Sequence, residues 1–263
     1  MSSFPPIKDL PPVLDSTGWI WTPYRTPLVY SGNFWLGTDQ FGNRWLTKLR
    51  GSFYAYREIV FARLAQRMGW SCQSSVFLRL AAEHVKELGM AQDDVHAAHW
   101  FMEEHARDRH CSDNCAFLFL LDRSLETVED FKGSYISHLI DWPKRDFAAC
   151  LFGANEPCDR FITASHEFVI IDSELMFSTG PTELSGTRWW NLPDGRPSHS
   201  GRSLALEVCR EVASLSLRDL HDALFIAPQI TIQQRWPIAP RLFASHAFAV
   251  ECTVHPGKMS RGR

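Results

Sequence analysis

Short apolar runs separated by turn residues predict strands near the start of the chain. Residues 28–30, 34–37 and 43–48 form three such runs. Between them, Ser31-Gly32-Asn33 is small and polar, and residues 39–43 carry a hairpin signal. Because short apolar runs bounded by Gly, Asn, Asp and Ser are typical of strands, the pattern predicts a small β-rich region here.

The apolar positions then change to a helical period. From Arg57 to Met68 they recur every three or four residues, and Gly69 follows as a C-cap. Residues 76–80 favour a further strand, and residues 95–103 fit either a strand or a helix. In the second half, helices are predicted over 124–131, 144–152, 204–215 and 217–224, and a loop over 178–201. The pattern therefore predicts an α+β protein whose strands come early and whose helices come late.

Composition and charge narrow the classes of function. With 263 residues the chain can form one large domain or two lobes, and its net charge is −3. The absence of a basic excess argues against nucleic-acid or membrane-surface binding. No run of 18 apolar residues is present, and the first residues lack the pattern of a signal peptide. A cytoplasmic protein is therefore expected, whose seven cysteines are thiols or metal ligands.

Three charged residues stand where a phosphate-handling site needs them. Lys48 ends a predicted strand, Glu58 lies ten residues later on the predicted helix, and Asp172 follows the apolar run 168–171. A lysine can hold phosphates, a glutamate can fix the lysine, and a strand-end aspartate can hold Mg²⁺. Gly32 lies in a turn that could cover phosphates, although it is the only glycine there. The alternative is that Lys48 and Glu58 are ordinary surface charges.

A polar loop precedes the strand that leads to Asp172. It runs from Asn155 through Glu156 and Asp159 to Thr163, and it offers two carboxylates to accept a proton. A polar loop, a short strand, a turn and a second strand ending in an acid are the order in which kinases present their catalytic loop and metal-binding aspartate. The alternative is a simple turn at Glu156-Pro157 and a local ion pair at Asp159-Arg160.

Two segments resemble the HipA-like kinase family. The first is Trp45-Leu46-Thr47-Lys48-Leu49-Arg50-Gly51 with the helix around Arg57-Glu58, and the second is residues 171–177. The resemblance covers about residues 28–178. It implies a two-lobed protein-kinase-like fold with a small β-rich N-lobe and a mainly helical C-lobe. ATP would lie in the cleft, with Lys48 on the phosphates, Glu58 holding Lys48, and Asp172 binding Mg²⁺.

The interpretation as a two-lobed fold predicts the domain limits. It gives an irregular Pro-rich segment (1–26), an N-lobe (27–105), a C-lobe with the catalytic loop (106–256), and a disordered tail (257–263).

The loop departs from the family in one respect. Family members carry an aspartate as base and an asparagine five residues later. Here the residue five positions after Asn155 is Arg160, after Glu156 it is Phe161, and after Asp159 it is Ala164. Either Asp159 or Glu156 acts as the base in an altered geometry, or only nucleotide binding remains.

A separate cluster of possible metal ligands lies upstream. His105, His110, Cys111 and Cys115 fall within eleven residues, and Zn²⁺ prefers four nitrogen and sulfur ligands. The cluster is compact, and the adjacency of His110 and Cys111 is awkward for one ion. Two buried thiols beside exposed imidazoles fit the sequence equally well.

Three functions follow from these residues. The first is an ATP- and Mg²⁺-dependent phosphotransferase acting on an unknown protein or small molecule. The second is a catalytically inactive kinase fold that senses nucleotide or binds a partner. The third is a zinc-stabilised interaction protein that shares only the fold with kinases.

Overall fold

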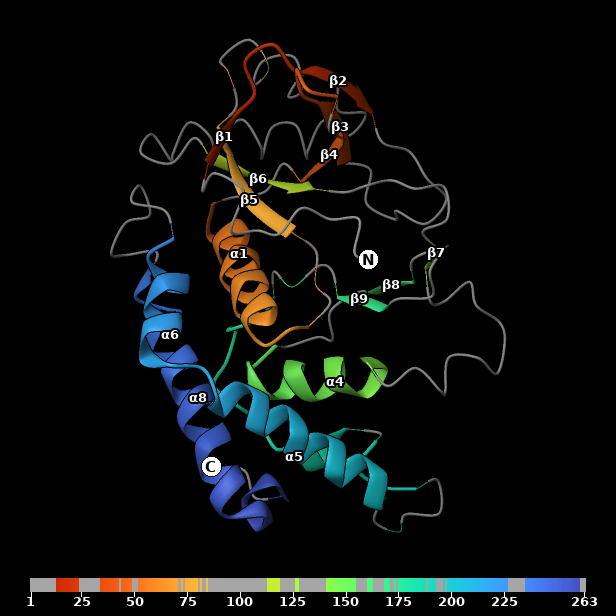
Figure 1. Ribbon diagram of the computed structural model, residues 1–263, viewed down its shortest axis with the longest axis vertical. Coiled ribbons are helices and arrows are strands. Elements are labelled where there is room, and N and C mark those ends of the chain that lie inside the picture. The colour runs from red at the N-terminus through yellow and green to blue at the C-terminus, as the bar shows by residue number, and fades with distance from the viewer. Residues whose placement is uncertain are drawn as a thin grey trace.

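The computed structural model describes slightly more than half of the chain with placed backbone (Figure 1). The described residues are 13–23, 34–42, 44–48, 52–70, 72, 74–79, 81, 84, 113–118, 126–127, 141–154, 160–162, 168–170, 173, 175–187, 189–192, 196, 198–226 and 235–260. At several strand and helix positions, including 46–48, 52–55 and all of 113–118, only the backbone is described.

A six-stranded sheet occupies the N-terminal half of the chain. Its strands are β1 (Val13–Asp15), β2 (Ile20–Pro23), β3 (Phe34–Thr38), β4 (Arg44–Lys48), β5 (Ser74–Arg79) and β6 (Asp113–Leu118). They lie in the order β1-β5-β6-β4-β3-β2. β1 runs parallel to β5, and every other neighbouring pair is antiparallel. β4, which ends at Lys48, is therefore an inner strand with partners on both sides.

Tryptophans pack together on this sheet. The rings of Trp19 and Trp21 stack with centroids 5.6 Å apart, and Trp19 stacks on Trp45 at 5.9 Å. Gly37 lies beneath them, and a Cβ at this position would meet the Trp19 ring at 2.7 Å. The indole Nε1 of Trp45 donates to a carboxylate oxygen of Asp39 at 3.0 Å. Large aromatic side chains and one small residue thus build the packing around β2, β3 and β4.

Helix α1 (Ser52–Arg67) lies between this sheet and the helices that follow it, as Figure 1 shows. It contacts β5 and β6 on one side and α6 on another. Its buried residues, among them Val60, Phe61 and Leu64, belong to one core cluster with residues of the later helices. Residues 56–62 are all buried, so the helix is covered over more of its circumference than the single apolar face that the predicted period indicates.

The C-terminal half is mainly helical. It contains α4 (Asp141–Leu151), α5 (His199–Ala213), α6 (Leu217–Leu224) and α8 (Ala239–Val254), with short 3-10 helices η3 (Leu184–Gly186) and η4 (Pro256–Ser260). A second sheet has the order β7 (Glu126–Thr127), β8 (Arg160–Ile162), β9 (Phe168–Ile170). α5 packs along α8, and α4 packs on α5 and touches β9. No helix among the described residues has the length and apolarity to cross a bilayer.

Several predicted limits differ from the structure. β1 and β2 lie within residues 1–26, which were expected to be irregular, and β6 lies beyond residue 105 yet belongs to the first sheet. Residues 126–127 form strand β7 inside the predicted helix 124–131. The 3-10 helix η4 includes residues 257–260, the first part of the tail (257–263) that was expected to be disordered. Strand pairing decides the first three cases, because pairing partners distant in sequence leave no local signal.

Candidate functional site

Lys48 is the last residue of β4. Its backbone is paired with Phe34 on β3 and with Cys115 on β6. The predicted position of this lysine at the end of a strand is therefore confirmed for the backbone, and the strand is held in place from both sides.

Glu58 lies on α1 and is only 1% exposed. A carboxylate at this depth is costly to bury without a polar or cationic partner. The alternative that Glu58 is an ordinary surface charge is therefore wrong. The helix that carries it contacts β5 and β6, and β6 is the neighbour of the strand that ends at Lys48.

The two strands that follow the predicted catalytic residues and lead to the predicted metal-binding residue form a hairpin. Arg160 pairs with Ile170, and Ile162 pairs with Phe168. Asn155, Glu156 and Asp159 lie between the end of α4 and β8, outside the described residues. Asp172 is also outside them, two residues after β9. The two strands of the predicted order are therefore present, the loop before β8 and the turn between the strands lie outside the described residues, and the roles of these four residues stay predictions.

The segment directly after Asp172 is closely packed. Ser173 is fully buried, and its Oγ has no hydrogen-bond partner within the described part of the chain. Its carbonyl accepts from the Met176 amide at 3.0 Å. Phe177 is fully buried with a positive φ of 59°. A non-glycine residue holds this conformation only where its surroundings impose it.

Hydrogen bonds with the residue that follows α4 and with a side chain of α8 hold Phe177. Its amide donates to the carbonyl of Phe152, just beyond α4, at 2.7 Å. Its carbonyl accepts from Nη1 of Arg241 on α8 at 2.6 Å. The ring of Phe152 makes edge contacts with Phe61 of α1 and with Phe177, each with centroids 5.6 Å apart. The turn after Asp172 is thus fixed to α1, α4 and α8 at once.

Arg57, the neighbour of Glu58, reaches the same turn. Its Nη1 donates to the hydroxyl of Ser178 at 2.9 Å, and that hydroxyl donates to the carbonyl of Leu175 at 2.6 Å. Arg57 is 7% exposed. A hydrogen bond from a buried guanidinium is among the stronger polar contacts in proteins.

Gly153 completes the junction between α4 and this turn. Its carbonyl accepts from the Thr179 amide at 2.9 Å, and its φ is +62°. A Cβ at Gly153 would lie 2.3 Å from the carbonyl oxygen of Thr179. Only glycine fits this close approach, which occurs two residues before the predicted loop begins at Asn155.

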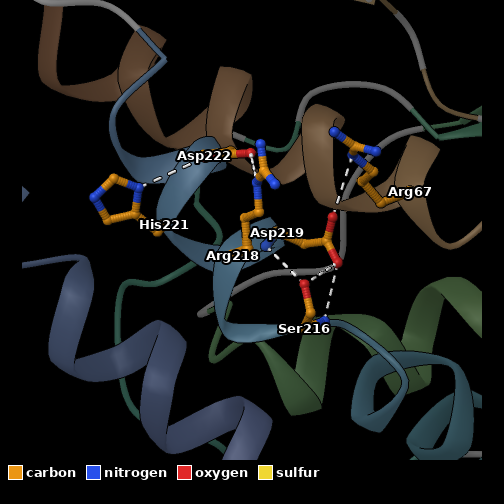
Figure 2. A network of polar contacts seen from close by, with 6 residues as sticks. All are labelled: Arg67, Ser216, Arg218, Asp219, His221 and Asp222. Carbon is orange, nitrogen blue, oxygen red and sulfur yellow. Dashed lines mark hydrogen bonds and ion pairs between the residues drawn. The ribbon is translucent and has the colours of Figure 1, made fainter.

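The C-terminal end of α1 is anchored to α6. Figure 2 shows Arg67 and Asp219 directed toward each other, with an N···O separation of 3.5 Å. Ser216 and Asp219 form a capping box at the start of α6, and the bonds from Ser216 hold the pKa of Asp219 below its usual value. Further along α1, the Tyr56 hydroxyl donates to the Leu224 carbonyl at 2.6 Å. Burial raises the pKa of Tyr56, which keeps this hydroxyl as a donor.

The remaining predicted site residues are not described. Gly32, His105, His110 and Cys111 lie outside the described residues, and Cys115 is described only as backbone within β6. Within the described ranges, no group of three or more His, Cys, Asp or Glu residues could hold a metal ion. The structure gives zinc no support, and the four-ligand site stays a prediction because three of its members are not described.

Sequence reasoning did not find Arg57, Ser178, Gly153 or Arg241. Arg57 and Ser178 are 121 positions apart. Nothing local marks such a pair. Gly153 was expected only as the end of a helix, and the contact that requires it comes from Thr179.

The fold has a solved counterpart. The chain is similar to the Helicobacter pylori proinflammatory kinase CtkA, with a TM-score of 0.54 and 10% sequence identity. The similarity covers 92% of this chain and 99% of that chain. No protein-family model and no curated protein sequence matches the chain. The structural similarity shows a kinase-like fold, and the HipA-like family assignment stays a prediction.

Proposed function

We propose that this protein is an ATP- and Mg²⁺-dependent phosphotransferase with a two-lobed arrangement. The observation that carries the proposal is the burial of Glu58 on a helix packed against the sheet that contains Lys48. In a kinase-like fold, a helix glutamate that holds a strand lysine is the arrangement that positions ATP phosphates. The hairpin β8–β9, which leads to Asp172, supports the same assignment.

The residues present fit the nucleotide and its metal. Lys48 would neutralise phosphate oxygens, Glu58 would orient Lys48, and Asp172 would supply a carboxylate of the kind that Mg²⁺ prefers. Ser173, adjacent to Asp172, has a buried hydroxyl with no partner among the described residues. Such groups in proteins are usually satisfied by a bound molecule or an ordered water. Bound Mg²⁺ would offset the charge that develops on the phosphates.

The transfer itself would need few protein groups. An acceptor hydroxyl would form a bond to the γ-phosphorus while the bond to the bridging oxygen breaks, giving a phosphate ester and ADP. Asp159 or Glu156 would accept the hydroxyl proton. Because catalysis of this kind is mostly positioning and charge neutralisation, the fixed geometry of α1 and β4 is the main contribution of the fold.

A thermal-shift experiment tests the proposal. Mg²⁺-ATP at about 100 times its Kd should raise the Tm by about 5–10 °C, because a ligand that binds only the native state stabilises it. Lys48→Ala and Asp172→Ala should each abolish the shift. Lys258→Ala on η4 and Asp222→Ala on α6 are matched controls that should keep it. Equal responses of all four variants and the parent would show that the site is wrongly assigned.

One sequence feature favours a second candidate. The loop has no asparagine five residues after any of its acids, so the usual second metal-binding group is missing. A nucleotide-binding module without transfer activity would show the same thermal shift and no phosphate transfer to any offered acceptor.

A further inference from the structure

The contact between Arg57 and Ser178 joins two parts of the proposed site that are far apart in sequence. Arg57 precedes Glu58 on α1, and Ser178 belongs to the turn that follows Asp172. The guanidinium bonds to the Ser178 hydroxyl at 2.9 Å, and the hydroxyl bonds to the Leu175 carbonyl at 2.6 Å. The Ser178 hydroxyl thus closes the turn through Leu175 and connects it to α1 through Arg57.

The Arg57–Ser178 hydrogen bond can fix the position of the turn relative to α1. Arg57 is 7% exposed, so water competes weakly for its bond to Ser178. The turn is also held by the Phe152 and Arg241 bonds to Phe177, which leave Phe177 with little freedom. Ser173 directly follows Asp172 in the sequence, so we expect a fixed turn to restrict Asp172 as well.

The geometry points to Arg57 and Ser178 as positioning residues that hold the metal-binding Asp172 and the lysine-holding Glu58 in a fixed relation. The inference rests on the proposed function and adds residues that the sequence did not indicate. Loss of the Arg57–Ser178 bond would leave the fold and ATP contact in place and would weaken the binding of Mg²⁺ together with ATP.

The test measures the Mg²⁺ concentration that gives half of the ATP-induced rise in Tm. In Ser178→Ala this concentration should increase about tenfold, the scale of one hydrogen bond to a charged group. Arg57→Gln should behave in the same way, and the double variant should be no worse than the worse single variant. Ser178→Thr, which keeps a hydroxyl, should remain close to the parent. Arg67→Gln, the same substitution at an exposed position of α1, is the matched control.

A second measurement follows the turn without nucleotide. The Met176 and Ser178 amides bond to the Ser173 and Leu175 carbonyls, so their hydrogen exchange reports whether the turn is intact. Both should exchange faster in Ser178→Ala than in the parent. This variant alters a half-buried loop hydroxyl, so it decides the matter even where Arg57→Gln does not fold.

The outcomes separate the two proposals. A parent protein with no ATP-dependent shift would refute the proposed function, and this inference with it. A parent that responds to ATP, with unchanged Mg²⁺ dependence in Ser178→Ala and Arg57→Gln, would refute only the positioning role. Unchanged amide exchange in Ser178→Ala would refute the claim that the hydroxyl holds the turn.

Discussion

Arg57 and Glu58 are neighbouring ionisable residues that are both buried on α1. Both are nearly inaccessible to water although both side chains are ionisable, and they lie on a helix whose other buried positions are mostly apolar. Charged side chains are seldom buried to this extent unless they are paired. Arg57 has its partner in Ser178 on the turn after Asp172. Glu58 was selected from the sequence by its spacing from Lys48, whereas Arg57 carried no comparable signal.

At the same scale, substitutions of Glu156 and Asp159 test whether the protein is an active phosphotransferase. If the protein transfers phosphate, either Glu156→Gln or Asp159→Asn should reduce the transfer rate by about 10²-fold or more, the usual contribution of a general base. Affinity for ATP should change little, because neither residue is assigned to the nucleotide. The rate of labelled-phosphate transfer measures activity, and the thermal shift with Mg²⁺-ATP measures binding.

Comparing Glu156→Gln with Asp159→Asn provides an internal control. The variant of the acid that is not the base should retain most of the transfer activity. Asp222→Asn, at an exposed position of α6, should behave like the parent. Full activity in both loop variants would exclude the two acids as the base.

At the scale of elements, the junction of α4 with the turn after Asp172 depends on one glycine. Gly153 has a positive φ, and the Thr179 backbone lies where its side chain would be. Gly69, just beyond α1, has a similar φ of +75°, and a Cβ there would meet nothing within 4 Å. The two glycines therefore share the backbone requirement and differ in the close contact.

This difference predicts the effects of alanine at the two positions. Gly69→Ala should lower the free energy of unfolding by about 1–2 kcal/mol, the strain of a left-handed residue. Gly153→Ala should lower it by about 1–3 kcal/mol more, because the Thr179 segment must also move. Urea denaturation of both variants measures the two values. Equal losses would mean that the Thr179 contact is not tight in solution.

The sequence predicted most of the helices but missed several of the strands. α1 was predicted from its apolar period, and helices were also predicted at α4, α5 and α6; the limits of α6 agree, and those of the other three are shifted by up to five residues. α8 was not predicted, although its residues 239–254 are rich in alanine and apolar side chains. A helix that is apolar over most of its surface lacks the polar face that reveals a period. β1 and β6 were missed because their pairing with β5 is not visible locally.

At the scale of the whole molecule, the described core is concentrated in the helices. One buried apolar cluster joins side chains of α1, α4, α5, α6 and α8. The buried residues of the sheet, such as Trp35, Trp45 and Val76, do not belong to that cluster. Helix α1 therefore packs as part of the helical body, although it follows the fourth strand in sequence and also contacts the sheet. The predicted domain limits placed this helix in the N-lobe (27–105), whereas its buried apolar side chains share a cluster with the later helices.

This assignment predicts a pattern of hydrogen exchange. Backbone amides of α1 from Val60 to Leu64 should exchange as slowly as those of α5 and α8, because they open only with the shared core. Amides of the edge strand β2 should exchange faster. Mass spectrometry of peptides from these elements gives the comparison. The packing would be contradicted by α1 amides that exchange at the rate of the sheet.

The packing of α1 with the helical body has a consequence for the affinity of the protein for a nucleotide. Lys48 belongs to the sheet, whereas Glu58 and the turn after Asp172 belong to the helical body. A nucleotide that contacts both would bind only the fraction of molecules in which the two are correctly oriented, and its apparent Kd would rise as that fraction falls. Substitutions along the boundary between α1 and β5, which touch neither phosphate nor metal, would then tune nucleotide binding by changing this population.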